Sequence, residues 1–168
     1  TRPADTCRPW LVVGTPITVF APDHVLLAGG NPGLGEVLRA RCPEGTTITE
    51  RRGEFAVLSV QGPKSREALQ RLTSADLSNE AFPYYTILDG IELAGIPAQL
   101  NRLGFTAELG YEVLIPVDRA AEFFKALFAS SEDLGIRFCG AAALMMARIE
   151  AGMVMGELEY AHTVTPFE

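Results

Sequence analysis

The spacing of hydrophobic and polar residues divides the chain near Gly53, and the first part is the less regular one. Two short apolar runs on either side of a Pro-Asp pair, residues 17–20 and 25–28, predict a β-hairpin. Apolar residues at helical spacing predict a helix over 34–41, and a β-branched, alternating segment predicts a strand over 46–50. We interpret residues 1–53 as a partial N-terminal α+β segment.

After Gly53 the pattern is more regular and predicts strand, helix, strand, strand, helix and strand in that order. These elements cover residues 55–60, 65–72, 85–93, 96–103, 119–133 and 136–139. A polar turn at 106–110 interrupts the third strand, whose apolar pattern resumes after it, and Asp118 is the expected cap of the long helix. This order is typical of the ferredoxin-like split βαβ arrangement, an antiparallel sheet with helices on one face.

The fold class predicted from this pattern is therefore α+β. The ferredoxin-like part covers residues 54–140, and part of a second α+β domain precedes it. A last helix over 141–150, ended by Gly152, begins a segment, 141–168, that we expect to return to the first domain.

Composition narrows the class of protein. The 168 residues are 48% apolar and 21% charged, as in ordinary globular proteins, and no apolar run approaches the roughly 18 residues of a membrane span. The net charge of −7, with Lys and Arg scattered, argues against nucleic-acid binding. Three distant cysteines, Cys7, Cys42 and Cys139, indicate reduced thiols and a cytoplasmic location, with no metal-binding spacing.

The two ends of the chain suggest a piece of a longer polypeptide. It begins at Thr1 without a methionine, and its last four residues, Thr-Pro-Phe-Glu, read as the start of another segment. We therefore expect a fragment or a single domain.

One carboxylate stands out in the stretch NRLGFTAELGYEVLIP, residues 101–116. Glu112 lies in an otherwise apolar strand, where burying an unpaired charge is costly. Strand alternation places Glu112 and Leu114 on one face. Two interpretations follow: an edge-strand glutamate that faces water, or a partly buried carboxylate that binds a ligand with adjacent N–H donors, such as a pterin ring.

Other motifs have simpler structural explanations. The glycine-rich stretch 29–35 lacks the register of a phosphate-binding loop and predicts a turn that leads into a helix. Four methionines near the C-terminus are expected to fill the core, and the alternative is an adaptable apolar wall for an aromatic ligand: Met145, Met146, Met153 and Met155. Two isolated histidines, His24 and His162, predict no metal site.

Five segments, in order along the chain, carry a family resemblance. They are residues 55–64 (FAVLSVQGPK), 75–78 (ADLS), 102–112 (RLGFTAELGYE), 147–152 (ARIEAG) and 165–168 (TPFE). Together they resemble the aminomethyltransferase family, which includes the T-protein of the glycine cleavage system and the folate domains of sarcosine and dimethylglycine dehydrogenases. The stretch DLSNEAFP is closer to those dehydrogenase domains. The resemblance implies a tetrahydrofolate site in a central cavity between domains.

The resemblance implies roles for particular residues. Glu112 matches the glutamate that holds the pterin ring, and Phe105 stands where the T-protein has a tyrosine beside the folate. Arg102 is a third candidate folate-site residue, which would orient the loop. Leu144 stands where the T-protein has a ligand-binding arginine. Arg148 matches an arginine that we interpret as paired with a carboxylate.

Near the N-terminus the family's key residues are missing. Gly14 or Thr15 stands where the T-protein has its key aspartate, and Ala28 where it often has an asparagine. Losing one preorganised charged group commonly lowers the rate by about 10²-fold or more, so the T-protein reaction is expected to be inefficient here. The catalytic residues stay unknown.

Three functions follow from these observations. The first is a tetrahydrofolate-binding, aminomethyltransferase-like protein that handles one-carbon units from a small donor or a carrier protein, and so a one-carbon transferase. The second is a non-catalytic scaffold or regulatory relative, although the family's iron–sulfur-assisting cysteine motif is absent from the sequence. The third is a ferredoxin-like ligand-sensing domain.

Overall fold

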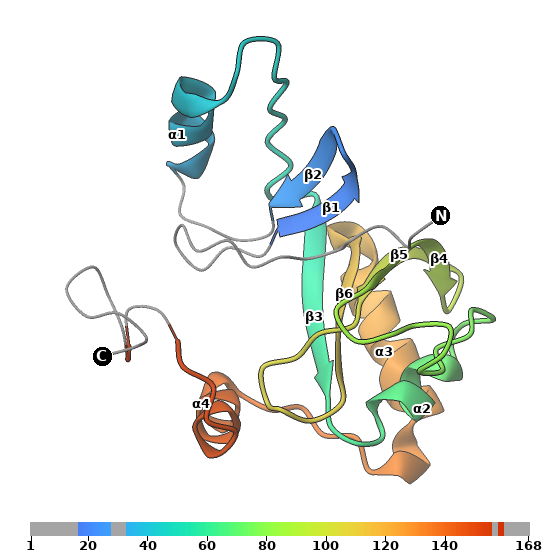
Figure 1. Ribbon diagram of the computed structural model, residues 1–168. Coiled ribbons are helices and arrows are strands. Elements are labelled where there is room, and N and C mark those ends of the chain that lie inside the picture. The colour runs from blue at the N-terminus through green and yellow to red at the C-terminus, as the bar shows by residue number, and fades with distance from the viewer. Residues whose placement is uncertain (1–16, 28–32, 156–157, 160–168) are drawn as a thin grey trace. The chain divides into compact units, whose positions relative to one another are not determined.

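The computed structural model describes residues 17–27, 33–155 and 158–159, and the chain divides into two compact units, Thr1–Gly53 and Glu54–Glu168 (Figure 1). In the first unit, β1 (Ile17–Ala21) pairs antiparallel with β2 (His24–Leu27), and α1 spans Leu34–Arg41. The predicted hairpin and helix are thus confirmed. The strand predicted over 46–50 is wrong, because this segment finds no partner strand in the described chain and forms a loop.

The second unit is built on a four-stranded antiparallel sheet in the order β3-β6-β5-β4. Its strands are β3 (Phe55–Gln61), β4 (Ile87–Leu93), β5 (Ile96–Asn101) and β6 (Gly110–Pro116). Its helices are α2 (Ser65–Gln70), α3 (Ala120–Ser130) and α4 (Ala141–Glu150), with 3₁₀ turns at Val117–Arg119 and Glu132–Leu134. The α+β class with an antiparallel sheet is confirmed.

The polar turn before Glu112 separates two strands and does not interrupt one. β5 ends at Asn101, the chain turns, and β6 returns beside it, so that Asn101 stands opposite Glu112. The fourth strand of the sheet is therefore β6, and the strand predicted over 136–139 is wrong. In that segment Ile136 packs against the core, while Phe138 is 79% exposed and lies edge-on to Phe124 of α3.

The long helix is shorter than predicted, and Asp118 does not cap it. Asp118 belongs to the 3₁₀ turn before α3, and Arg119 at the N-cap position makes no capping side-chain bond. Arg119 instead donates two hydrogen bonds to Glu122, of 2.6 and 2.8 Å. This i,i+3 ion pair orders the first turn in place of a cap.

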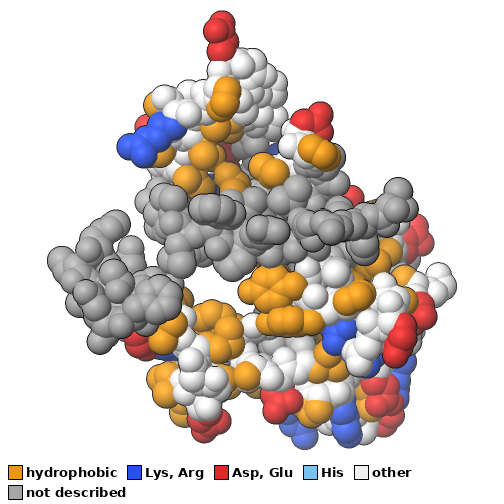
Figure 2. All heavy atoms as spheres, in the orientation of Figure 1, with side chains coloured by type: hydrophobic (Ala, Val, Ile, Leu, Met, Phe, Trp, Pro, Cys, Tyr) orange, Lys and Arg blue, Asp and Glu red, His pale blue; other side chains and the backbone are white. Residues whose placement is uncertain are grey.

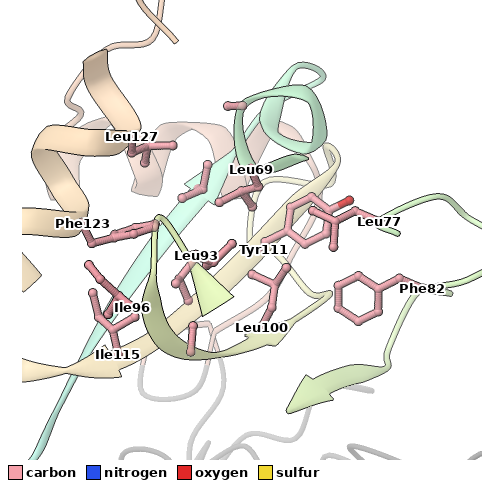
Figure 3. Close-up of a cluster of buried hydrophobic side chains, with 14 residues drawn as sticks. Leu69, Leu77, Phe82, Leu93, Ile96, Leu100, Tyr111, Ile115, Phe123 and Leu127 are labelled. Atoms are coloured by element: carbon pink, nitrogen blue, oxygen red, sulfur yellow. The ribbon is translucent and has the colours of Figure 1, made fainter. Parts of the chain in front are cut away.

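The main core lies between one face of the sheet and the helices α2 and α3 (Figure 3). From the sheet, alternate residues of β6 contribute Tyr111, Val113 and Ile115, each fully buried. Leu69 of α2 and Phe123 of α3 pack against them from the helical side. Alternation along β6 therefore places Glu112 on the opposite face.

Gln61, the last residue of β3, fits between two glycines of the 104–110 loop. Its amide nitrogen donates to Ser59 Oγ at 3.0 Å and to the Tyr111 carbonyl oxygen at 3.4 Å. A Cβ atom on Gly104 or Gly110 would lie 2.2 or 1.9 Å from Gln61 Oε1. The glycines of this loop are thus explained by close packing against one side chain.

Gly110→Ala is expected to lower the free energy of unfolding by about 1–3 kcal/mol, because the new methyl group displaces the Gln61 side chain and breaks its hydrogen bonds. In a Gln61→Ala background the same change should be nearly neutral. Urea unfolding followed by circular dichroism measures both. Gly140→Ala is the matched control, since a Cβ there would meet nothing within 4 Å. A full loss in the Gln61→Ala background would contradict this packing.

Candidate functional site

Glu112 lies on an interior strand, so its interpretation as an edge-strand residue is wrong. β6 pairs with β3 on one side and with β5 on the other, which places Ser59 and Asn101 opposite Glu112. The side chain of Glu112 is half-buried, and Leu114, its neighbour on the same face, is buried. The carboxylate is thus held on a rigid element and partly removed from water.

This environment changes the acidity of Glu112. Partial burial raises the pKa of the Glu112 carboxyl, because its charged form loses hydration, and the Asn101 side chain, opposite it on β5, partly offsets this by lowering the pKa. An acceptor that is partly desolvated interacts more strongly with a ligand's N–H groups than one in bulk water. The strand therefore presents a carboxylate suited to binding a hydrogen-bond donor.

Arg102 contacts the segment that leads into β4. Its side chain is buried, and its guanidinium donates from Nη1 to the Phe82 carbonyl oxygen and from Nη2 to Asn79 Oδ1 at 2.7 Å. Its backbone bonds to Thr86 and Tyr85. These contacts hold the 79–86 segment against the end of β5, and none of those described reaches Glu112.

Phe105 is half-buried in the turn between β5 and β6. The turn also forms one wall of an open cleft of about 570 Å³. The residues that line the cleft are Tyr84, Arg102, Gly104, Ala107, Glu108, Leu109, Gly110 and Met153. The structure therefore brings Arg102 to this cleft, but neither Phe105 nor Glu112 lines it.

The methionines near the C-terminus differ in their surroundings. Met153 lines the cleft, and Met146 on α4 is 61% exposed, so the prediction that all four fill the core is wrong. Ile149, on the same helix, is equally exposed, and hydrophobic side chains at the surface of α4 are visible in Figure 2. The main core lies between the sheet and the helices α2 and α3, and this part of α4 stays at the surface.

Arg148 forms the predicted pair with a carboxylate. Its buried guanidinium lies 2.6 Å from Glu159 Oε1 and donates to the Met153 carbonyl oxygen at 3.1 Å. Glu159 also accepts a hydrogen bond from the Met155 amide, and the Arg148 contact holds the pKa of this carboxyl below its usual value. Leu144, one helical turn earlier, is half-buried and supplies no charge.

Several residues singled out in the sequence lie outside the described residues: Cys7, Gly14, Thr15, Ala28, the glycine-rich stretch 29–32, His162 and the tail 165–168. Among residues 17–27, 33–155 and 158–159, no group of three or more His, Cys, Asp and Glu side chains could hold a metal ion. In that part of the chain no helix is both long and apolar enough to cross a membrane.

The sequence analysis missed two polar side chains beside Glu112. Gln99 and Asn101 alternate with apolar residues along β5 and are 9% and 4% exposed. Their i,i+2 spacing signals that they share one face of the strand. That this face is the one that carries Glu112 follows only from the pairing of β5 with β6.

Comparison with known proteins decides the family. The model of the GCVT N-terminal domain family matches residues 16–168. The chain belongs to this family. The resemblance to aminomethyltransferases in the sequence is thereby confirmed.

Aminomethyltransferases are also among the individual relatives of this GCVT N-terminal domain. The aminomethyltransferase of Caldanaerobacter subterraneus subsp. tengcongensis is 34% identical over 115 residues, which cover 68% of this chain and 30% of the relative. That of Shouchella clausii is 35% identical over 133 residues, 79% of this chain and 36% of the relative. The mitochondrial aminomethyltransferase of Mesembryanthemum crystallinum is 32% identical over 163 residues, which cover 92% of this chain and 39% of the relative. The chain thus spans about a third of these relatives.

Proposed function

We propose that this chain is the tetrahydrofolate-binding part of an aminomethyltransferase-like protein that handles one-carbon units. The observation that carries the proposal is the environment of Glu112, a half-buried carboxylate on an interior strand beside the Asn101 amide. Membership of the GCVT N-terminal domain family and aminomethyltransferase relatives at about one-third identity support it.

The chemistry of the site suits this ligand. The pterin ring of tetrahydrofolate carries adjacent N–H donors, and an ionised carboxylate accepts two parallel hydrogen bonds from such a pair. Ser59 and Asn101, which face Glu112 across the neighbouring strands, are polar and uncharged. Glu112 would hold the ring, Phe105 would pack beside it, and Arg102 would keep the adjoining loop in place.

The transfer reaction itself depends on groups beyond Glu112. When bound, tetrahydrofolate supplies the nucleophile that accepts the one-carbon unit. This chain would bind and orient it, but the family resemblance places Leu144, an apolar residue, where the T-protein has an arginine. We therefore propose a one-carbon transferase that is slow with the aminomethyl carrier of the glycine cleavage system. Its one-carbon donor would be a different small molecule or carrier protein.

Isothermal titration calorimetry of the full chain with tetrahydrofolate tests the binding proposal. Saturable binding with a stoichiometry near one is expected, and no heat of binding at ligand concentrations up to about 1 mM would refute it. Ammonia or formaldehyde release from candidate donors tests the enzymatic part. Binding without any turnover would favour the alternative, a relative that keeps the fold and has lost the transfer chemistry.

A further inference from the structure

Two buried amides lie on the face of the sheet that carries Glu112. In β5, Ala98 and Leu100 belong to the main core, so Gln99 and Asn101 lie on the other face. They are 9% and 4% exposed, although most polar side chains of this size stay at the surface. Asn101 stands opposite Glu112 in the register, and Gln99 stands opposite Leu114. Buried amides persist where their hydrogen bonds are made.

The two amides are bonded to each other in one direction. Gln99 Nε2 donates to Asn101 Oδ1 at 2.7 Å. Because this bond engages the oxygen of Asn101, the NH₂ group of the same amide is left to face Glu112, which stands opposite it in the register, and the lowering effect of Asn101 on the pKa of the Glu112 carboxyl agrees with that orientation. Gln99 thus fixes the orientation of the Asn101 amide, so that its NH₂ group and not its oxygen faces the Glu112 carboxylate.

We propose that Asn101, locked in place by Gln99, is a positioning residue that holds the Glu112 carboxylate ionised and oriented for a neutral ring with adjacent N–H donors. This inference rests on the proposed function. A carboxylate must be ionised to accept two parallel N–H bonds, since a protonated one presents its own O–H to the ligand. Asn101 therefore selects rings that offer a donor pair over rings that offer acceptors at that edge.

Uncharged groups surround Glu112 on both neighbouring strands. Ser59 and Gln61 flank it from β3, and Asn101 flanks it from β5. Among the described residues, no charged group contributes to the pKa of Glu112: burial raises it and Asn101 lowers it. The charge state of Glu112 therefore depends on its partial burial, which has the larger effect, and on the Asn101 amide, and ligand binding should weaken as the pH falls through the pKa of Glu112.

The test is a ¹³C NMR titration of the Glu112 carboxyl carbon in the full chain and in three variants. Asn101→Leu removes the amide and should raise the midpoint by about one pH unit. Gln99→Leu frees the Asn101 amide to rotate and should raise it less. Gln70→Leu is the matched control. It removes the same kind of amide from α2, where Gln70 donates to the Ala75 carbonyl oxygen and not to the strand that carries Glu112, so it should leave the Glu112 midpoint unchanged.

Asn101→Asp is a second variant, to be used if Asn101→Leu does not fold, because aspartate has nearly the same shape as asparagine. It places a like charge beside Glu112 and should raise the midpoint more than leucine does. Tetrahydrofolate affinity measured against pH should fall at a correspondingly higher pH in Asn101→Leu than in the unmodified chain.

A Glu112 midpoint unmoved by both Asn101 variants would overturn the inference, even if tetrahydrofolate binds. Failure of the unmodified chain to bind tetrahydrofolate would refute the proposed function, while the NMR midpoints still decide the role of Asn101.

Discussion

Replacing Glu112 with glutamine is expected to lower the affinity for tetrahydrofolate by about 10- to 100-fold. A hydrogen bond to a charged group is worth about 1.5–3 kcal/mol, and the glutamine amide presents one oxygen and a competing NH₂ group where the carboxylate presents two acceptors. Calorimetry at pH 7 measures the change. Glu92→Gln, the same substitution at an exposed position of β4, is the control and should bind as the unmodified chain does.

The same variant should be at least as stable as the unmodified chain at pH 7. Burial raises the pKa of Glu112 in the folded chain, so the folded state binds this proton more tightly than the unfolded state does. Ionised Glu112 therefore opposes folding once the pH exceeds its folded-state pKa, and the neutral amide removes that cost. Urea unfolding at pH 7 tests this. A variant that lost both binding and stability would point to a structural role for the carboxylate.

Phe82→Ala is expected to lower the free energy of unfolding by about 3–5 kcal/mol, the usual range for a buried aromatic residue. Phe82 is fully buried, and its ring stacks on Tyr111 with 5.9 Å between centroids. Its carbonyl oxygen accepts a hydrogen bond from Arg102, so the ring anchors the segment that holds that arginine. Urea unfolding followed by circular dichroism measures the loss.

Phe138→Ala makes the same chemical change at the surface and is the matched control. Phe138 is 79% exposed, and its one described ring contact is with Phe124, at 6.0 Å between centroids. Its loss should therefore lower stability by less than about 1 kcal/mol. Equal losses for the two phenylalanines would show that the segment around Phe82 does not belong to the cooperative core.

The spacing of apolar residues within a segment predicted the positions of the helices better than those of the strands. The helices at 34–41 and 141–150 have the predicted bounds, because helical hydrogen bonds join residues four apart and the apolar spacing lies within one segment. The predicted strand over 46–50 had a suitable composition but found no partner in the described chain. A strand exists only where a second segment completes its hydrogen bonds, and that segment can be far away in sequence.

Part of the candidate site could be read from the sequence. Glu112 stood out as a carboxylate within an apolar strand, and the family motifs around it agree with the family match. Its partners could not be identified in the same way. Asn101 lies eleven positions earlier, across a turn whose conformation decides whether the two flanking segments form one strand or two. Gln99 and Ser59 enter the site only through the register of β5 and β3 against β6.

The sequence by itself determined the class of the fold, the family and the residue most worth testing, because each is encoded in neighbouring residues or in motifs that keep their order. The tertiary structure decided that β6 is an interior strand, that Gln61 fits between two glycines, and that Arg102 holds the 79–86 segment. It also decided that Asn101 faces Glu112. These facts depend on strand register, and a shift of a single residue would turn every side chain of β6 to the opposite face.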